Sequence, residues 1–506
     1  MKKLNHYKKI LQDKSKDLSF WDYLKYITSW QEVSFYKFDG FVSKFPDTDR
    51  IKWIWTMKDF DIEVEDSMKN NNFLDEKKSF FENFWKLFKS LNMPHMIQFF
   101  ENENSEYSDV VVGCKNNYLS NINTNAENCL YTFSIKESEN VINSVAVWKH
   151  SSNVYFSSWI NNSFKIFYSR YIINSNNVWF SSNLIWCTEC IKCDNLENQK
   201  YCINNEKLEK SEYLKQKKEI LKNKWEFYKN YTKLSKKSAS FNSKNVSWNF
   251  ILNWEDLENN YFVSDTKNWK NLMFFGGDSE NENNYNIFSW GTWKNVHTYS
   301  TMWCWMWNEH VYNSVHIPFW NNVFYCYYVT SCSFCIWCVW LKNKSYCILN
   351  KQYTKEDWEK KALEIFEKME KSWNLWEFWP AKINPFYFND TVAGLIWNFK
   401  KEEVISEGFM WRDEKIKVDI PDENKIIYSS PQPFPEGEGV KSLDDFEWFN
   451  SDWNWKINPE ILKKVIKDDS WNYYRIVKME YDFLVKYELP LPRLHWLDRM
   501  KVNFGI

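Results

Sequence analysis

The sequence predicts a protein that is mostly β with helices: two β-solenoid segments of about 12-residue repeats, each followed by an α-helix, plus small α+β terminal modules. Three observations lead to this prediction. Apolar or cysteine positions recur about every 12 residues over two long stretches, polar turn residues separate them, and the second stretch repeats the cysteine spacing of the first. Alternation within each short run is the pattern of a strand and not of a helix.

The cysteine pattern indicates that the chain is built twice on one plan. Four cysteines are spaced 3, 3 and 9 residues apart, and four others repeat this spacing 145 residues later. The two quartets are Cys187, Cys190, Cys193 and Cys202, and Cys332, Cys335, Cys338 and Cys347. A lysine-rich segment with helical spacing follows each quartet, so the duplication includes a helix after each solenoid.

The residues before each quartet extend the repeat. The anchors are Cys129, Val141, Val154, Ile166, Val178, Cys190 and Cys202 in the first half, and Tyr261, Leu272, Tyr285, Val296, Val311, Val323, Cys335 and Cys347 in the second. Asparagine precedes many of them, and it tolerates the left-handed backbone of a tight corner. Repeats that stack with aligned anchors form a solenoid, although the spacing leaves open whether one coil holds 12 or 24 residues.

Turn, proline and helix signals place the other segments. We expect an N-terminal degenerate module at 1–70, a helical lead-in at 71–107, the first solenoid at 108–205, a helix at 206–240, the second solenoid at 245–350, a helix at 351–372, a linker region rich in proline and charge at 373–445, and a C-terminal module at 446–506. Disorder is the alternative for the asparagine-rich stretches, but regular anchors and many aromatic residues argue against it.

Composition limits the possible functions. The chain has 506 residues and a formal net charge of −2, which gives no global field that would favour nucleic acid as a partner. No apolar stretch is long enough for a transmembrane helix. The basic start lacks an apolar region after it, so we expect no secretory signal. Twelve cysteines without such a signal indicate a cytoplasmic protein whose thiols are free or bind metal.

Glycine and tryptophan are present in abnormal numbers. The chain has 10 glycines and 32 tryptophans, whereas an average protein of this length has about 35 glycines. We hypothesise that many of these tryptophans are glycines in the organism, because a gene that uses UGA for glycine gives this result when UGA is translated as tryptophan. A tryptophan-rich surface is the alternative.

Several motifs resemble an uncharacterised family from bacteria with reduced genomes. The matching segments are 80–84, 104–108, 116–120, 338–353, 384–393, 411–414, 480–484 and 489–493. The resemblance implies Asn/Cys-rich β-solenoid repeats between zinc-ribbon-like terminal modules, with no established activity. The family has glycine where this chain has Trp337 and Trp340. Its cysteine pairs near the last motif are missing here, so we expect 446–506 to be a degenerate zinc-ribbon-like module.

The cysteine quartets allow two interpretations. Four thiolates suit Zn²⁺ or an iron–sulfur cluster. However, Cys190 and Cys202 are one repeat apart, as are Cys335 and Cys347, so these side chains would stack as small apolar groups in the core. The repeat favours this structural role, and zinc is the alternative cofactor.

Other groups of polar residues carry weaker signals. Histidine occurs with other potential ligands in one cluster, for which a polar solenoid face is the simpler explanation; its members are His297, Cys304, Glu309, His310 and His316. Asp278, Glu280 and Glu282 are expected in a loop. A modest basic patch near the end is expected to be solvated surface; it contains Arg475, Arg493, His495, Arg499 and Lys501.

The sequence does not identify an activity, and three hypotheses follow. The first is a non-enzymatic binding or structural scaffold that offers solenoid surfaces to an unknown protein or glycan partner. The second is a zinc-binding protein with one ion in each quartet. The third is a carbohydrate-active β-helix enzyme that uses Glu309 or His310; no nucleophile elbow, phosphate-binding loop or HExxH motif supports another chemistry. The oligomeric state is not determined by the sequence.

Overall fold

The computed structural model describes most of the chain, in two compact units. The described residues are 2–55, 68, 73–99, 101–234, 241–246, 251–258, 263–264, 267–273, 284–289, 293–304, 306–317, 321–372, 375, 377–397, 399–418, 420, 426–430 and 442–504. Unit 1 comprises Met1–Val33, Phe45–His95 and Ala239–Arg412, and unit 2 comprises Ser34–Lys44, Met96–Ser238 and Asp413–Ile506. Each unit therefore combines one solenoid with segments that precede and follow it in the chain.

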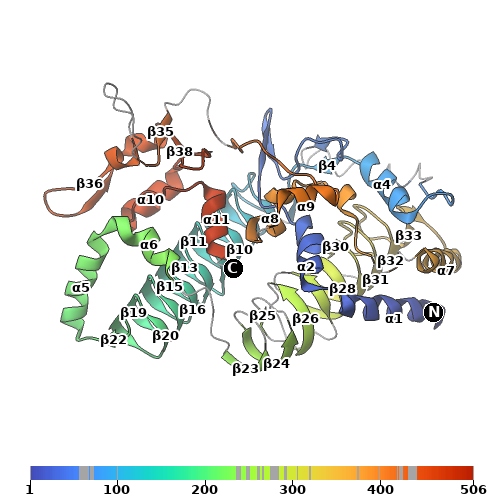
Figure 1. The fold of residues 1–506 in the computed structure, drawn as a ribbon, viewed down its shortest axis with the longest axis horizontal. Coiled ribbons are helices and arrows are strands. Elements are labelled where there is room, and N and C mark those ends of the chain that lie inside the picture. The colour runs from blue at the N-terminus through green and yellow to red at the C-terminus, as the bar shows by residue number, and fades with distance from the viewer. Residues whose placement is uncertain are drawn as a thin grey trace. The chain divides into compact units, whose positions relative to one another are not determined.

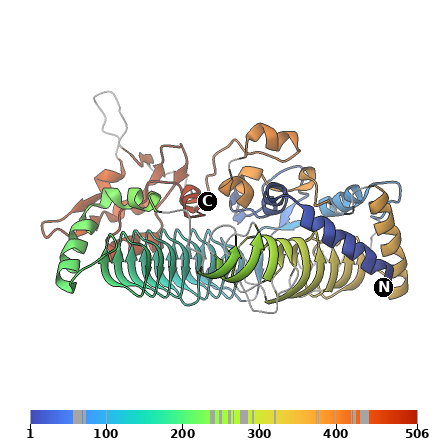
Figure 2. The same cartoon turned by 60° about the horizontal axis from the view of Figure 1, so that its bottom comes forward.

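The first solenoid lies in unit 2 and confirms the predicted fold class. Strands one repeat apart pair in parallel, for example through Cys129 and Val141. One coil therefore holds 12 residues and adds one strand to each of two sheets, and Figure 2 shows the coils stacked along one axis. One sheet contains β5 (Gln98–Phe99), β6 (Asp109–Val112), β8 (Asn121–Thr124), β10 (Phe133–Lys136), β12 (Val145–Trp148), β14 (Ser158–Asn161), β16 (Arg170–Ile173), β18 (Ser182–Ile185) and β20 (Asp194–Glu197). The other contains β7 (Lys115–Tyr118), β9 (Glu127–Leu130), β11 (Glu139–Ile142), β13 (Ser152–Tyr155), β15 (Phe164–Phe167), β17 (Asn176–Trp179), β19 (Thr188–Ile191), β21 (Lys200–Ile203) and β22 (Glu206–Lys207).

The backbone of this solenoid turns by a left-handed residue at about every third position. Asn116, Leu119, Ile122 and Asn125 have φ angles of 53°, 43°, 67° and 47°. A left-handed residue costs roughly 1–2 kcal/mol for most side chains, which explains why asparagine is frequent there. As predicted, the asparagines that precede the anchors have positive φ angles; they are Asn128, Asn140, Asn153 and Asn177.

Inward-facing side chains form four columns along the solenoid. Two "strand columns" are mainly apolar: one runs through Asn117, Cys129, Val141, Val154, Ile166, Val178, Cys190 and Cys202, and the other through Val111, Asn123, Ile135, Val147, Ile160, Ile172, Leu184 and Leu196. Two "turn columns" are mainly serine. Ser169 accepts a hydrogen bond from the N–H of Ser181 at 3.2 Å and donates to the carbonyl of Phe167 at 2.9 Å. The serines thus satisfy buried backbone groups in a coil too narrow for large side chains.

The second solenoid lies in unit 1, and its described strands form one sheet. Val311 pairs with Val323 and Cys335 with Cys347, again one coil apart. Three predicted anchors are wrong: Val311 pairs with Thr298, and Leu272, Tyr285 and Val296 lie outside this column. Tyr261 falls outside the described residues. The strands are β23 (Phe241–Val246), β24 (Ile251–Glu258), β25 (Val263–Ser264), β26 (Lys267–Met273), β27 (Tyr285–Phe288), β28 (Trp293–Cys304), β29 (Met306–Tyr312), β30 (Val315–Ile317), β31 (Asn321–Phe324), β32 (Ser333–Ile336), β33 (Ser345–Ile348) and β34 (Lys351–Gln352).

A helix follows each solenoid, as predicted (Figure 1). These are α5 (Lys210–Lys222) and α7 (Lys355–Lys371), and Thr354 begins α7 by accepting a hydrogen bond from the N–H of Asp357 at 3.1 Å. The others are α1 (Lys2–Asp17), α2 (Phe20–Asp22), α4 (Phe80–Ser90), α6 (Phe227–Thr232), α8 (Val392–Ile396), α9 (Lys401–Ser406), α10 (Lys478–Tyr487) and α11 (Trp496–Phe504). No helix in the described part of the chain is long and apolar enough to cross a membrane.

Helices cover one flank of the first solenoid within unit 2. Aromatic rings make the contact: Phe180 meets Phe227 of α6 at 4.9 Å between ring centroids, and Phe133 meets Phe504 of α11 at 5.2 Å. Tyr155 stacks on Phe483 of α10 at 5.8 Å. Each such ring buries a large apolar area, so this flank belongs to the core of the unit.

The segment 442–504 contains two hairpins with equivalent turns. One joins β36 (Glu447–Phe449) to β37 (Trp455–Ile457), and the other joins β38 (Val465–Lys467) to β39 (Tyr473–Tyr474). The carboxamide of Asn450 accepts the N–H of Asn454 at 2.8 Å, and the carboxylate of Asp468 accepts that of Asn472 at 2.8 Å. Side-chain oxygens thus close both turns. The remaining strands are β1 (Tyr36–Phe38), β2 (Phe41–Ser43), β3 (Ile54–Trp55), β4 (Met93–Pro94) and β35 (Ile426–Tyr428).

Candidate functional site

Both cysteine quartets lie in the interior of the last coils of their solenoids. In the first, Cys187, Cys190 and Cys193 are consecutive inward-facing residues of one coil. The stacked pairs are Cys190 with Cys202 and Cys335 with Cys347. Exposure does not exceed 1% for any of these eight side chains. The thiols are therefore core groups, and each quartet surrounds the axis of its solenoid.

One central thiol interacts with the others in each quartet. Interaction with the neighbouring Cys190 thiol lowers the pKa of Cys187 to about 7 and also lowers the pKa of Cys193. The same two interactions raise the pKa of Cys190. In the second quartet, burial and hydrogen bonds to its three neighbours raise the pKa of Cys335. A central thiol that keeps its proton therefore stabilises the thiolate form of a neighbour.

Each cysteine of the first quartet also continues a column of the solenoid. Cys190 and Cys202 extend the strand column of Val178, whereas Cys187 and Cys193 take the place of serine in the turn columns. The N–H of Cys193 donates to the hydroxyl of Ser181 at 3.0 Å. In the second solenoid, sulfur replaces the serine oxygen itself: Cys326 accepts the N–H of Cys338 at 3.3 Å. Among the described residues, no three His, Cys, Asp or Glu side chains are arranged to hold a metal ion.

The predicted histidine cluster is divided by the structure. His297 and His310 stack one coil apart, with ring centroids separated by 5.0 Å and planes inclined by 5°. His316 lies elsewhere, stacked on Tyr328 at 3.9 Å. The side chain of Cys304 falls outside the described part of the structure, as do Asp278, Glu280 and Glu282. The histidine pair therefore has Glu309 as its acidic neighbour, with 3.6 Å between the His310 Nε2 and Glu309 Oε1 atoms.

A lysine of α1 covers the histidine pair. Lys8 is only 8% exposed, and burial lowers the pKa of Lys8 to about 8 while Glu309 opposes this shift. Burial, together with the charges of Lys8 and His297, lowers the pKa of His310 to about 4. The cluster therefore forms a desolvated contact between α1 and the second solenoid.

A groove on the first solenoid escaped the sequence analysis. Its volume is about 420 Å³. It is lined by Asn125, Glu127, Glu137, Ser138, Glu139, His150, Ser151 and Ser152. Lys149 and His150 are consecutive left-handed residues, with φ angles of 52° and 59°. Their coil therefore contains one residue more than the other coils. The 13-residue interval from Val141 to Val154 was the signal in the sequence.

The groove belongs to two sides of the first solenoid that remain open. Exposed side chains on these sides include Asn125, Glu127, Glu139, Lys149, Asn162, Phe164, Asn176 and Trp186. Asparagine side chains bond along the axis: Asn116 donates to Asn128 at 2.9 Å, and Asn128 donates to Asn140 at 3.2 Å. We call these surfaces the open sides, and they repeat at the spacing of β-strands, about 4.8 Å.

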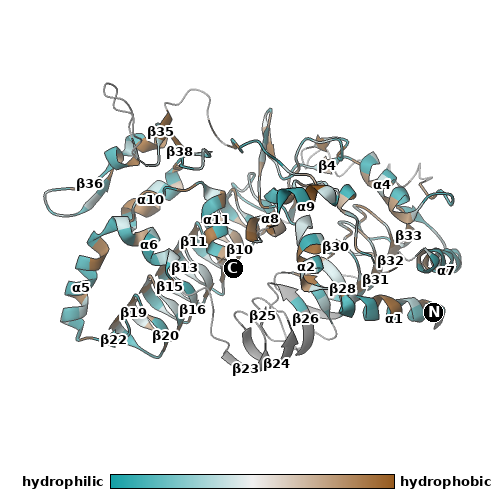
Figure 3. Ribbon diagram, viewed as in Figure 1, coloured by the Kyte–Doolittle hydropathy of each residue, from teal (hydrophilic) through white to brown (hydrophobic). Residues whose placement is uncertain are grey.

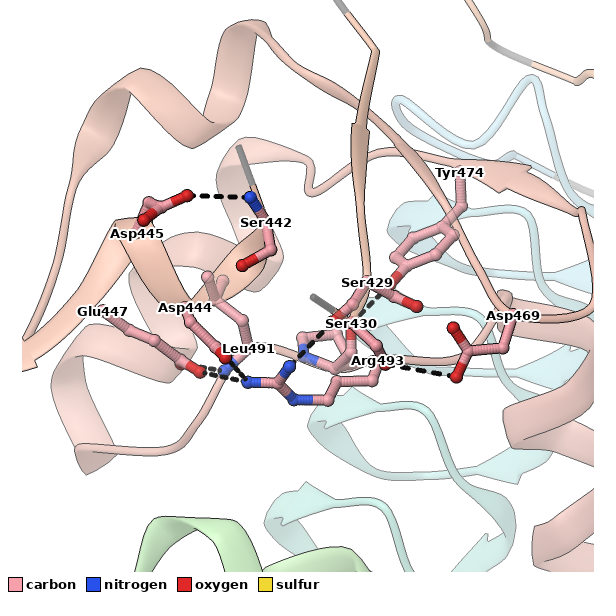
Figure 4. A network of polar contacts seen from close by, with 11 residues as sticks. Ser429, Ser430, Ser442, Asp444, Asp445, Glu447, Asp469, Tyr474, Leu491 and Arg493 are labelled. Carbon is pink, nitrogen blue, oxygen red and sulfur yellow. Dashed lines mark hydrogen bonds and ion pairs between the residues drawn. The ribbon is translucent and has the colours of Figure 1, made fainter. Parts of the chain in front are cut away.

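The expected basic patch near the end of the chain is solvated surface only in part: Lys501 is exposed, whereas His495 and Arg499 are buried. Arg499 is 1% exposed, and its Nη1 lies 2.8 Å from Oε1 of Glu480. Arg493 donates to the carbonyl of Ser429 at 2.7 Å and to Asp444 and Glu447 (Figure 4). These arginines are used in internal ion pairs that no local sequence pattern indicates, because their partners come from distant segments.

Comparison with known proteins adds no name to these features. No protein-family model, no curated protein and no solved structure matches the chain. The resemblance to a bacterial repeat family therefore depends only on the motifs given above, and functional inference depends on the chemistry of the described surfaces.

Proposed function

We propose that this protein is a non-enzymatic scaffold that binds a glycan chain on the open sides of the first solenoid, with the groove as the main contact. The single observation that carries this proposal is that the unit covers one flank of the solenoid with helices but leaves a polar groove uncovered at its one irregular coil. Solenoids commonly bind extended partners along such surfaces. All eight thiols of the quartets are then structural, and a reducing compartment such as the cytoplasm suits them.

The lining of the groove favours a glycan over a protein partner. All eight of its residues are polar: three glutamates, three serines, one asparagine and one histidine. The three serines are buried, so Asn125, His150 and the glutamates are the groups that can accept from and donate to sugar hydroxyls. Protein interfaces instead depend on aromatic or arginine side chains that fill pockets, and the groove offers none. Glu127 and Glu139 pair across adjacent strands, so their carboxylates are available to neighbouring sugar units.

Binding to immobilised glycans tests the proposal. We expect the wild-type protein to bind one class of polysaccharide, and the double variant Glu127→Gln and Glu139→Gln to bind at least about tenfold more weakly, as loss of two charge-assisted hydrogen bonds implies. Asn174→Ala, on the same open sides but outside the groove, is the matched control. Absence of binding to every glycan tested contradicts the proposal, and release of shorter sugars would identify an enzyme instead.

We also propose that several tryptophans, among them Trp186 on the open sides, are glycines in the organism. Within the described part of the chain, six tryptophans have positive φ angles: Trp159, Trp186, Trp337, Trp340, Trp453 and Trp471. Glycine is the residue that adopts this conformation without cost. Trp453 and Trp471 occupy equivalent hairpin turns with 65% and 66% exposure, and the buried indole N–H of Trp337 has no hydrogen-bond partner among the described residues. UGA codons at these six positions are expected, and UGG codons there contradict the proposal.

Zinc binding by the quartets is a second candidate, favoured by the contact of the Cys190 thiol with Cys187, Cys193 and Cys202. Four thiolates are the usual ligands of structural zinc, so zinc binding would require the thiols of a quartet to move from their described positions into a tetrahedral site. Metal analysis of the purified protein tests it. Two equivalents of zinc, with loss of the last coils when a chelator removes them, would establish the site. Intact coils in zinc-free protein would reject it.

A further inference from the structure

The last coil of the first solenoid has a strand edge without a neighbour. Strand β20 is the terminal strand of its sheet, because among the described strands it pairs only with β18. The hairpin of β21 and β22 closes the other sheet at this end. Leu196, the one apolar residue of β20, is half-buried, and Figure 3 shows the strand as mostly hydrophilic. Such an edge offers backbone N–H and C=O groups to another chain, and we call it the β20 edge.

A side chain occupies only the beginning of the β20 edge. Asn205 accepts the N–H of Asp194 at 2.8 Å, and its amide donates to the carbonyl of Asp194 at 2.9 Å. These two bonds take the place of a following strand. Leu196 pairs with Leu184 in the same register as Asp194 pairs with Ser182, so the Leu196 N–H points to the same side of the strand. It is therefore the donor that a partner strand would engage.

The counterpart end of the second solenoid is covered. The duplication relates Leu196 to Leu341, and Asn350 makes the same two bonds to Val339 that Asn205 makes in the first solenoid. Val339 and Leu341 are nevertheless buried, with 0% and 1% exposure. The side chain of Met68 packs against the core cluster that includes Leu341. Because the interior of stacked coils is accessible only at an end, we infer that this position of the repeat accepts an apolar side chain from another segment.

The charge at the β20 edge has no basic counterpart within the strand. β20 carries Asp194 and Glu197 and no lysine or arginine. The side chains that donate to these carboxylates are serine and asparagine, so no basic residue neutralises either of them in the described part of the chain. Lys200 and Lys207 lie in β21 and β22 of the other sheet. The β20 edge therefore attracts a positively charged segment.

The second solenoid shows the opposite combination of charges. Lys342 takes the position of Glu197, and Lys351 that of Glu206; both lysines are exposed. In the sequence, the residues 59–66 that precede Met68 include five acidic residues and no basic residue. An apolar side chain that follows an acidic segment thus meets a basic end. By the same chemistry, an acidic end suits an apolar side chain within a basic segment.

We propose that the β20 edge binds an extended basic segment of a partner protein. The segment adds one strand to the sheet, places an aliphatic side chain against Leu196 and directs lysine or arginine at Asp194 and Glu197. A second copy of this chain is a poor occupant, because antiparallel pairing of two β20 strands sets acidic side chains opposite each other. The β20 edge is distinct from the glycan groove, so each proposal can fail without the other.

Fluorescence anisotropy with a synthetic peptide tests the proposal on the full chain. The probe is fluorescein-labelled Thr-Lys-Thr-Val-Lys-Thr, which in parallel register sets its valine on Leu196 and its lysines on Asp194 and Glu197. We expect saturable binding that weakens about tenfold in Glu197→Lys and in Leu196→Lys. Glu139→Lys, the same charge change at an exposed strand residue of an earlier coil, is the matched control and should bind as wild type does. Circular dichroism verifies that each variant is folded.

Two further measurements decide between strand pairing and general attraction for cations. A peptide N-methylated at its second lysine keeps its charge but lacks the N–H that would donate to the Leu196 carbonyl, and it should bind at least about tenfold more weakly. Equal binding of the methylated peptide, or unchanged binding by both variants, overturns the proposal. A wild-type dimer in sedimentation analysis that Leu196→Lys abolishes, without peptide binding, would identify a second copy as the occupant and would also overturn it.

Discussion

The two solenoids end in the same backbone but close that end with different chemistry. At the first end, Glu189 pairs with Lys217 of α5, and the ring of Tyr213 lies 5.5 Å from that of Tyr201. At the second end, the position of Tyr213 holds Trp358, whose ring lies 5.4 Å from Phe334, the counterpart of Glu189. The Trp358 indole N–H also donates to the carbonyl of Cys347 at 3.3 Å.

This difference shows that a coil determines where its covering helix lies but not which interactions hold that helix. An apolar, aromatic contact buries a large area and stabilises strongly, whereas a partly exposed ion pair contributes little. We therefore expect the second end to be the more stable one, and the first end buries fewer residues of its helix.

Substitution of Trp358 by alanine should have the largest effect. Removal of this fully buried ring is expected to lower the free energy of unfolding of unit 1 by about 4 kcal/mol, because a cavity remains beside Phe334. Tyr213→Ala should cost about 2 kcal/mol, since α5 has few other buried contacts and can shift into the space. Hydrogen exchange over β33 and β21 measures both. Equal loss of protection at the two ends would contradict the comparison.

Serine in place of cysteine should distinguish the two kinds of column. Cys190→Ser inserts a hydroxyl into a strand column between Val178 and Cys202 and should cost about 2 kcal/mol. Cys193→Ser restores the residue that the turn column uses at Ser181 and should change stability by less than about 0.5 kcal/mol. Urea unfolding measures the difference. If the quartet holds a metal, both substitutions should be equally damaging, which would contradict a purely structural role.

The units should respond to pH in opposite directions. Burial lowers the pKa of His310 to about 4, so the unfolded chain binds a proton that the folded protein does not, and unit 1 should lose stability as pH falls from 6.5 to about 4. Burial raises the pKa of Glu447 to about 7. The folded protein then keeps a proton that the unfolded chain releases, and unit 2 should lose stability as pH rises from about 4.3 to 7.

Hydrogen exchange at several pH values should follow α1 and β36 to separate these trends. His310→Asn should remove the pH dependence of stability in unit 1; asparagine is the residue found one coil later, at Asn322. Glu447→Gln should remove the pH dependence of stability in unit 2. Parallel pH profiles in the two units would show that another group dominates.

The ion pair at the first end should have the smallest effect. Lys217→Ala is expected to cost about 0.5 kcal/mol, because both partners keep contact with solvent. Lys222→Ala, which removes an exposed pair with Glu219, should cost almost nothing and serves as the control. Thermal unfolding of unit 2 measures the two variants, and a loss above about 2 kcal/mol for Lys217→Ala would show that the polar contact is as important as the aromatic one.

Much of the solenoid was predictable because neighbouring coils repeat one another. The 12-residue interval from Cys129 to Val141 already indicated which residues pair in neighbouring strands. The asparagine before many of the anchors indicated the left-handed corners. At Thr298 the anchor position is polar. The predicted anchors of that region were therefore wrong, because only apolar residues and cysteines were expected at anchor positions. The groove was missed for a related reason. The interval of 13 residues indicates the extra residue at Lys149 and His150, but it does not indicate which side chains line the groove.

The sequence alone determines the repeat, the corner residues, the buried cysteines and the helix after each solenoid, because these depend on residues at most one coil apart. Only the tertiary structure decides which sides are covered, that Lys8 lies on the histidine pair, and that Arg499 is buried against Glu480. Those contacts join residues more than one coil apart in the sequence, and their energies come from desolvation and charge in a shared environment that no local pattern records.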